Sequence, residues 1–224
     1  MLNSELLVTE IFHSLQGETS FSGKRFAFVR LTGCNLRCTY CDSSYAFHGG
    51  ERLRISEVIA AISSYQVQHV LITGGEPLLQ RHTPELVHSL ISQGYLVSIE
   101  THGEVSISSV SKTARIVMDI KTPSSGISRG GYEKNLPFLK PTDEIKFVIA
   151  SQEDYKWAKT LVLSCAFPTK EILFSPAVPA EGSPGSFQEV PATWLAEKIL
   201  EDRLPVRFQL QLHKILWGAN RRGV

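Results

Sequence analysis

Residues 34–41 of the sequence read CNLRCTYC and bring three cysteines, Cys34, Cys38 and Cys41, into eight positions. Cysteine thiolates are the usual ligands of iron–sulfur clusters. Three thiolates at this spacing can bind three irons of a 4Fe–4S cluster and leave the fourth iron open. An open iron can bind a substrate or cofactor and pass it an electron, so this stretch predicts redox chemistry.

The fourth cysteine, Cys165, lies far from the other three, in the apolar run at residues 161–167. A structural zinc site generally needs four protein ligands, and Cys165 is the one cysteine left to supply the fourth. However, a lone cysteine in an apolar run is typically a buried and inert thiol. We therefore expect three cluster ligands and one bystander. A chain of 224 residues buries an adequate core without disulfides, and the sequence shows no secretory leader. We expect a reducing, cytoplasmic location.

The composition indicates one domain over residues 1–224, with 42% hydrophobic and 20% charged residues. No apolar run reaches the ~20 residues that a membrane helix needs, so we expect no membrane partner. The formal net charge of +1 gives no electrostatic footprint for nucleic acid. The expected partner is a small-molecule substrate.

Strand-like apolar runs alternate with amphipathic helical patterns along the chain, which predicts an α/β fold with a parallel sheet. The expected strands cover residues 26–31, taken as the first strand, and then 69–73, 95–100, 114–120, 144–150, 171–175 and 206–212. The expected helices cover residues 55–64, 84–93, 152–163 and 193–204, with Ser56 as a cap of the first. Residues 122–141 and 176–191 are expected to form active-site loops, and residues 219–224 a disordered tail.

The strand at residues 69–73 leads into the turn TGGEP at residues 73–77. In parallel β/α architectures, the carboxyl ends of the strands gather on one face, where ligands bind. The two glycines allow close approach of a ligand to the backbone. Glu76 supplies a carboxylate suited to an ammonium group, so we expect a binding site at this turn.

The cysteine motif after one strand, followed by GGEP after the next, resembles the radical S-adenosylmethionine superfamily. In that superfamily the open iron binds the methionine amine and carboxylate, and reductive cleavage of the sulfonium yields a 5′-deoxyadenosyl radical. The resemblance implies a 4Fe–4S cluster and S-adenosylmethionine as cofactors, and a partial, modified TIM-like (β/α) barrel as the fold. A shortened barrel fits 224 residues better than a complete barrel of ~250.

Within that superfamily, the sequence is similar nearly end to end to the 7-carboxy-7-deazaguanine synthase family. The matching segments are EIFHSLQGE at residues 10–18, FVRLTGC at 28–34, CDS at 41–43, IETHG at 99–103 and QLHK at 211–214. The family commonly has Thr at the position of Ser43 and Ser at the position of His102. It converts 6-carboxy-5,6,7,8-tetrahydropterin into 7-carboxy-7-deazaguanine with loss of ammonia, in the biosynthesis of queuosine and other deazapurines.

The resemblance also implies site residues. Substrate contacts are implied for Leu15, Gln16, Gly17, Glu18, Arg30 and Thr73. Among these, Arg30 is the expected partner of the pterin carboxylate. S-adenosylmethionine contacts are implied for Gly75, Asp119, Ile120, Lys121 and Ser175. The resemblance further implies a Mg²⁺ ion bound through the hydroxyl of Ser43, a homodimer, and an electron donor such as flavodoxin or ferredoxin.

Three other functions are compatible with parts of the sequence. A glycyl-radical enzyme activase shares the cysteine and GGEP motifs, but the segment SLQGE at residues 14–18 argues against it. An iron–sulfur electron carrier would need neither GGEP nor a full β/α domain. A zinc-stapled binding module would be recognised by its metal content.

Overall fold

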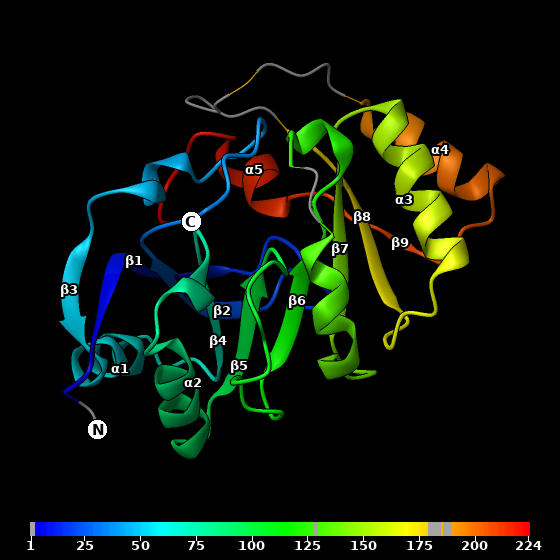
Figure 1. The fold of residues 1–224 in the computed structure, drawn as a ribbon. Helices are drawn as coiled ribbons and strands as arrows, with labels where there is room; N and C mark the ends of the chain where they lie inside the picture. The colour runs from blue at the N-terminus through cyan, green and yellow to red at the C-terminus, as the bar shows by residue number, and fades with distance from the viewer. Residues whose placement is uncertain (1–2, 128–129, 179–184, 186–189) are drawn as a thin grey trace.

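The fold is an open sheet with helices on its outer face, shown in Figure 1 as a computed structural model that describes residues 3–127, 130–178, 185 and 190–224. The described strands follow the order β3-β1-β2-β4-β5-β6-β7-β8-β9. They are β1 (Glu5–Leu15), β2 (Arg25–Leu31), β3 (Glu51–Arg54), β4 (His69–Gly74), β5 (Leu96–Thr101), β6 (Arg115–Asp119), β7 (Glu144–Ile149), β8 (Glu171–Pro176) and β9 (Arg207–Phe208). Much of the expected loop at residues 176–191 lies outside the described residues.

Neighbouring strands from β2 to β9 are parallel, whereas β1 pairs antiparallel with both β2 and β3. Because β3 and β9 stand at opposite ends of this order, the sheet does not close. The expected α/β partial barrel is confirmed. The expectation that residues 26–31 form the first strand is wrong, since β1 precedes them.

The helices are α1 (Ile55–Ser64), α2 (Thr83–Ser92), α3 (Gln152–Ser164), α4 (Ala192–Glu201) and α5 (Leu212–Trp217), with short 3₁₀ helices at η1 (Ser44–Phe47), η2 (Pro77–Leu79), η3 (Pro123–Ser125) and η4 (Gly131–Phe138). Figure 1 shows α1 and α2 beside the half of the sheet that contains β1 to β5, and α3 and α4 beside β7 to β9. The four predicted helices are confirmed as α1 to α4, with ends that shift by up to three residues.

Two sequence expectations fail at element ends. Ser56 does not cap α1, because the helix begins one residue earlier, where the Glu57 carboxylate accepts a hydrogen bond from the Arg54 backbone N–H at 2.8 Å. The last predicted strand is too long, since β9 covers only two residues and α5 begins at Leu212.

Side chains of the central strands alternate between an apolar face and a polar one. On β7, Ile145, Phe147 and Ile149 are fully buried in the main core, which they share with the inward residues of the helices. Lys146 lies between them in sequence and faces the opposite side of the sheet, where it lines a cavity. The core therefore holds the strands together from outside and leaves their inner face available for polar side chains.

An irregularity in β1 decides which of its residues reach this inner face. The register with β2 shifts between Val8 and Glu10, as in a β-bulge. Val8 packs in the main core, whereas Phe12 belongs to a separate cluster and stacks on Phe28 with ring centroids 4.8 Å apart. Beyond the shift, Glu10 stands directly opposite Arg30 on β2, so the two charges meet.

Candidate active site

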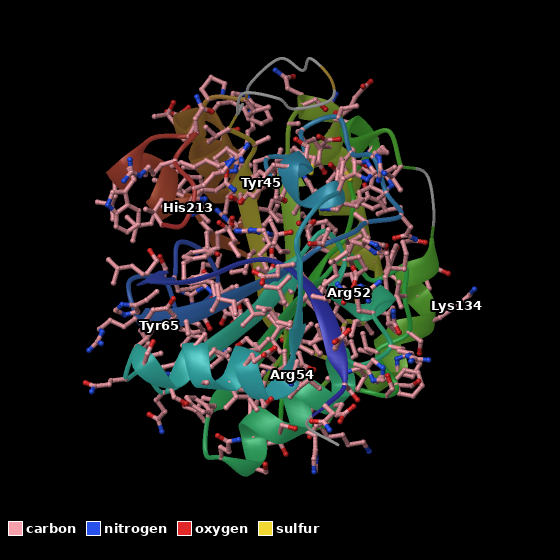
Figure 2. All side chains as sticks on the ribbon, turned by 90° about the vertical axis from the view of Figure 1, so that its left-hand side faces the viewer. Tyr45, Arg52, Arg54, Tyr65, Lys134 and His213 are labelled. Atoms are coloured by element: carbon pink, nitrogen blue, oxygen red, sulfur yellow. The ribbon has the colours of Figure 1, made fainter. Side chains whose placement is uncertain are left out.

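One cavity of about 280 Å³ lies at the carboxyl ends of the parallel strands. Its walls come from the ends of β2 and β4 to β7, the cysteine loop, the segment after β1, three residues at 211–214 and the C-terminal residues 219–224. Figure 2 shows Tyr45 and His213, two of its lining residues, in the upper half of the molecule. The strand ends therefore meet where the β/α architecture predicts a ligand site.

The three cysteines of the motif, Cys34, Cys38 and Cys41, line this cavity as free thiols. Burial raises the pKa of all three, that of Cys38 to about 11, and the neighbouring thiols Cys34 and Cys41 add to the rise at Cys38. The backbone N–H of Leu36 donates to Cys34 Sγ at 3.4 Å. Cys165 follows α3 and does not line the cavity. It is half-buried, not buried as expected.

These thiols fit a 4Fe–4S cluster. Within the described ranges, no group of three or more His, Cys, Asp or Glu side chains is arranged to hold a single metal ion. A 4Fe–4S cluster instead spreads its thiolate ligands over separate irons. Three free thiols on the wall of one cavity match that requirement.

The GGEP turn packs directly against the cysteine loop. Gly75 donates from its backbone N–H to Leu31 O at 3.1 Å, and Glu76 donates from its own to Gly33 O at 2.8 Å. A Cβ atom on Gly75 would come within 2.2 Å of Gly33 O and 2.7 Å of Cys34 Cβ. Only glycine therefore allows this approach, which sets the turn beside the first cluster ligand.

The Glu76 carboxylate does not do what the sequence led us to expect. It is fully buried, and it accepts hydrogen bonds from the backbone N–H of Leu78 at 3.0 Å, from Thr101 Oγ1 at 2.9 Å and from the backbone N–H of His102 at 2.9 Å. Burial raises its pKa to about 7. It does not line the cavity, so it fastens the turn to the end of β5 instead of facing an ammonium group.

Two of the expected cofactor residues beyond Gly75 face the cavity. Asp119 and Lys121 both line it and form an ion pair at 3.0 Å. Asp119 Oδ1 is buried and has no hydrogen-bond partner among the described residues, so it is available to a donor group on a ligand. Ile120 is packed in the main core and Ser175 is 1% exposed; the structure brings neither side chain to the cavity wall.

All of the expected substrate residues line the cavity: Leu15, Gln16, Gly17, Glu18, Arg30 and Thr73. Gln16 is buried and accepts a hydrogen bond from the Glu18 backbone N–H at 3.1 Å. Gly17 leaves no room for a side chain, since a Cβ there would meet His213 Nδ1 at 2.1 Å. The segment after β1 and the start of α5 thus form one wall.

Arg30 is oriented by neighbours that the sequence did not reveal. Its Nε donates to Glu10 Oε1 at 2.7 Å, and Tyr45 OH donates to the same oxygen at 2.8 Å. The guanidinium also lies over the rings of Phe12 and Tyr45, at 5.9 and 5.8 Å from their centroids. This cage holds Arg30 through one edge.

The sequence did not reveal Lys146, a buried lysine that lines the cavity and that we count as part of its floor. Lys146 is 4% exposed and pairs with Glu18 at 2.7 Å, with Asp119 at 3.3 Å and with Glu100. A lysine in the apolar run EIKFVI, at a position of inward alternation, was the signal that could have identified it.

The pKa values of this network follow its charges. Burial opposes the ionisation of Glu18, but the charge of Lys146, with a smaller contribution from His213, outweighs it and lowers the pKa of Glu18 to about 2. Burial would lower the pKa of Lys146, yet the three carboxylates hold it well above its usual range. For Glu100 burial prevails and raises the pKa. The floor of the cavity is therefore a charged cluster rich in hydrogen-bond acceptors.

The C-terminal segment contributes Gln211, His213, Lys214 and residues 219–224 to the cavity wall. Lys214 of α5 pairs with Asp42 at 2.7 Å, next to Ser43, which also lines the cavity. The Arg222 guanidinium lies 4.0 Å from the centroid of the Tyr45 ring. Residues 219–224 line the cavity, so the expectation of a disordered tail is wrong.

Known proteins are similar to this sequence over nearly its whole length. Residues 28–129 match the family model described as the Radical SAM superfamily. The 7-carboxy-7-deazaguanine synthase of Koribacter versatilis is 41% identical over 224 residues, which cover 97% of this chain and 99% of that protein. The chain belongs to the 7-carboxy-7-deazaguanine synthase family. The family member of Chlorobaculum tepidum is 40% identical and covers 98% of this chain and 97% of its own.

Solved structures agree on the fold. The crystal structure of QueE from Escherichia coli matches with a TM-score of 0.69 at 23% identity, over 92% of this chain and 94% of that chain. Streptococcus suis SuiB bound to S-adenosylmethionine matches with a TM-score of 0.60 at 14% identity, over 80% of this chain and 48% of that chain. Membership of the 7-carboxy-7-deazaguanine synthase family identifies a radical S-adenosylmethionine lyase and disfavours the activase, electron-carrier and zinc-module alternatives. None of the described helices is long and apolar enough to cross a membrane.

Proposed function

We propose that this chain converts 6-carboxy-5,6,7,8-tetrahydropterin into 7-carboxy-7-deazaguanine with loss of ammonia, within one domain over residues 1–224. The observation that carries the proposal is that the three free thiols and a polar compartment built from Gln16, Glu18, Arg30 and Lys146 share one cavity. Formation of 7-carboxy-7-deazaguanine from the pterin by the purified protein, detected by mass spectrometry, tests it.

The cluster would bind Cys34, Cys38 and Cys41, and S-adenosylmethionine would contact Gly75, Asp119 and Lys121. When bound, the two supply the radical chemistry that starts the reaction. The unpartnered Asp119 Oδ1 supports a role for this residue in accepting a hydrogen bond from the cofactor. Ile120 and Ser175 stay weaker proposals; Ile120 could contribute only its backbone, since its side chain belongs to the core.

The polar compartment has groups that complement both ends of a carboxypterin. The pyrimidine ring presents N–H donors, for which the oxygens of Glu18, Gln16 and Thr73 are suitable acceptors. The carboxylate needs a cation, and Arg30 can hold it in a two-pronged hydrogen-bonded pair through the edge that Glu10 does not use.

Replacing Arg30 by Ala is expected to weaken pterin binding by about 10- to 100-fold. Hydrogen bonds to charged groups are worth ~1.5–3 kcal/mol, and each ~1.4 kcal/mol is a factor of ten in affinity. The affinity for S-adenosylmethionine should change little. Titration of each ligand into the anaerobic variant measures both effects.

Two further variants separate substrate recognition from support of the site. Arg30→Lys should recover only part of the affinity, because an ammonium cannot reproduce the planar fork. Combining Arg30→Ala with Glu10→Gln removes the carboxylate that Arg30→Ala leaves without its partner. Equal losses of affinity for pterin and S-adenosylmethionine in both Arg30→Ala variants would contradict the assigned role.

We further propose that a Mg²⁺ ion binds beside the substrate through the hydroxyl of Ser43. Ser43 lines the cavity, with its Oγ 3.9 Å from Cys41 Sγ. The neighbouring Asp42 carboxylate is already paired with Lys214. The Ser43 hydroxyl is therefore the side-chain oxygen of this segment that we assign to the metal. Mg²⁺ commonly keeps several waters and takes few protein ligands, so one hydroxyl suffices.

Ser43→Ala is expected to lower turnover and to raise the Mg²⁺ concentration needed for half-maximal activity, while cluster content and S-adenosylmethionine binding stay unchanged. Ser43→Thr should perform about as well as the parent, because it keeps the hydroxyl. Magnesium titrations of activity compare the three proteins. Activity that is indifferent to Mg²⁺ in all of them would show that the metal assignment is wrong.

A homodimer, a flavodoxin or ferredoxin as the electron donor and a cytoplasmic location complete the proposal and rest on the family resemblance. The exposed apolar side chains Leu210, Ile215, Leu216 and Trp217, on and just before α5, are compatible with an interface between subunits.

A further inference from the structure

His102 follows β5 and lines the cavity, yet none of the assigned roles uses it. Its side chain is 4% exposed. The family motif that this segment resembles has Ser at this position, where this chain has His. A buried polar ring beside the cysteine loop needs hydrogen-bond partners, and these partners indicate what it does.

The hydrogen bonds fix the protonation state and the direction of the ring. The backbone N–H of Glu104 donates to His102 Nδ1 at 3.0 Å, so Nδ1 is an acceptor. Burial lowers the pKa of His102 to about 4, with a smaller contribution from the charge of Lys121, and the ring is neutral near pH 7. Its single proton therefore lies on Nε2, which donates to Asn35 Oδ1 at 2.9 Å. Glu76 Oε2 is a second acceptor near Nε2, but it lies farther away, at 3.3 Å.

This hydrogen bond is one of two that hold the residues on either side of Cys34. On one side of the cysteine, Gly33 O accepts from the Glu76 backbone N–H at 2.8 Å. On the other side, the Asn35 side chain accepts from His102.

The two hydrogen bonds are linked to each other, because His102 also bonds to Glu76. The backbone N–H of His102 donates to Glu76 Oε2 at 2.9 Å. The contacts therefore form a closed ring that runs from Glu76 through His102 and Asn35 to Gly33 and back. Cys34 is part of this ring, between Gly33 and Asn35 in the backbone.

We propose that His102 is a positioning residue that fixes Cys34 for cluster binding by holding Asn35 against the end of β5. The inference rests on the proposed cluster at Cys34, Cys38 and Cys41. Without the imidazole, the hydrogen bond to Gly33 remains and the Asn35 side is released. A Ser side chain at position 102 is too short to reach Asn35 from the same backbone. The iron bound to Cys34 is then held less firmly, and S-adenosylmethionine binds a less well-ordered site.

The test uses the cluster-loaded protein and two readouts other than activity. In His102→Ser, iron loss to an excess of an iron chelator is expected to be about three- to tenfold faster than in the parent, and the Kd for S-adenosylmethionine to rise by a similar factor. These factors correspond to the loss of one net hydrogen bond. His102→Gln should restore most of both values, because its amide N–H can reach towards Asn35.

Two more variants make the outcome specific. Asn35→Ala removes the same hydrogen bond from an exposed residue, so it should reproduce the effect even if His102→Ser loads its cluster poorly. The double variant His102→Ser/Asn35→Ala should be no worse than either single variant, since a shared contact is lost only once. The matched control is His88→Ser on the exposed side of α2, which should behave like the parent.

Unchanged iron loss and S-adenosylmethionine affinity in His102→Ser and Asn35→Ala would overturn the inference, as would strictly additive effects in the double variant. A parent protein that takes up no cluster or binds no S-adenosylmethionine would instead contradict the proposed function. The two failures are therefore distinguishable.

Discussion

Replacing any one of Cys34, Cys38 and Cys41 by Ala is expected to abolish S-adenosylmethionine cleavage and product formation. Each of the three thiols lines the cavity, whereas Cys165 does not. A cluster that must keep one iron open for its cofactor has no spare protein ligand. Anaerobic iron and sulfide analysis, together with detection of 5′-deoxyadenosine under dithionite, measures the loss.

Cys165→Ala is the matched control for these variants. It removes a thiol from the end of α3, away from the cavity, so cluster content and turnover should remain close to those of the parent. Loss of the cluster in Cys165→Ala, or normal turnover in any of the other three variants, would contradict the assignment of the ligands.

Lys146→Met is expected to destabilise the protein by about 3–5 kcal/mol near neutral pH, because breaking a buried ion pair leaves its partners uncompensated. Glu18, Glu100 and Asp119 would then share the floor of the cavity without their common cation. Urea denaturation of the cluster-free parent and variant under reducing conditions gives the difference in the free energy of unfolding.

The difference should depend on pH in a defined direction. Burial opposes the ionisation of Glu18, but the charge of Lys146 outweighs it and lowers the pKa of Glu18 to about 2. The pKa of Asp119 is also lowered against burial, by Lys121 first and Lys146 second, so Lys146→Met removes only part of that effect. Groups with a lowered pKa stabilise the fold above their unfolded values of about 4 and lose that contribution as the pH falls towards the folded value. The deficit of Lys146→Met should therefore be largest above about pH 5 and shrink below it.

Lys134→Met serves as the control for removing a lysine. Lys134 is exposed on η4, and Figure 2 shows its side chain pointing away from the molecule. Its replacement should change the free energy of unfolding by less than about 0.5 kcal/mol. A loss in Lys146→Met as small as that of the control would contradict the account of the buried network.

Local motifs made much of the site predictable. The cysteine spacing and the GGEP turn follow two successive parallel strands, and parallel strands end on the same side, so Cys34 and Gly75 had to be neighbours. Continuous apolar runs predicted β2 and β4 to β8. These features depend on short, continuous segments whose residues have strong chemical or conformational preferences.

What escaped prediction depends on long-range geometry. The bulge after Val8 interrupts the alternation of β1 and hides the strand, yet it turns Glu10 towards Arg30. Lys146 pairs with carboxylates from three other segments. These ion pairs join residues that are far apart in the sequence, so no local sequence pattern predicts them. The expected ammonium-binding role of Glu76 failed for the same reason, since Thr101 and His102 capture its carboxylate from the neighbouring strand.

The central claim is that the thiol wall and the polar compartment of this single cavity act together on a carboxypterin. Its most direct test is an anaerobic incubation of the cluster-loaded protein with 6-carboxy-5,6,7,8-tetrahydropterin, dithionite, Mg²⁺ and S-adenosylmethionine at a concentration below that of the pterin. We predict equal amounts of 7-carboxy-7-deazaguanine and ammonia, in excess over the S-adenosylmethionine supplied, as expected for a cofactor that is regenerated. Unchanged pterin in the presence of an intact cluster and bound S-adenosylmethionine would contradict the account.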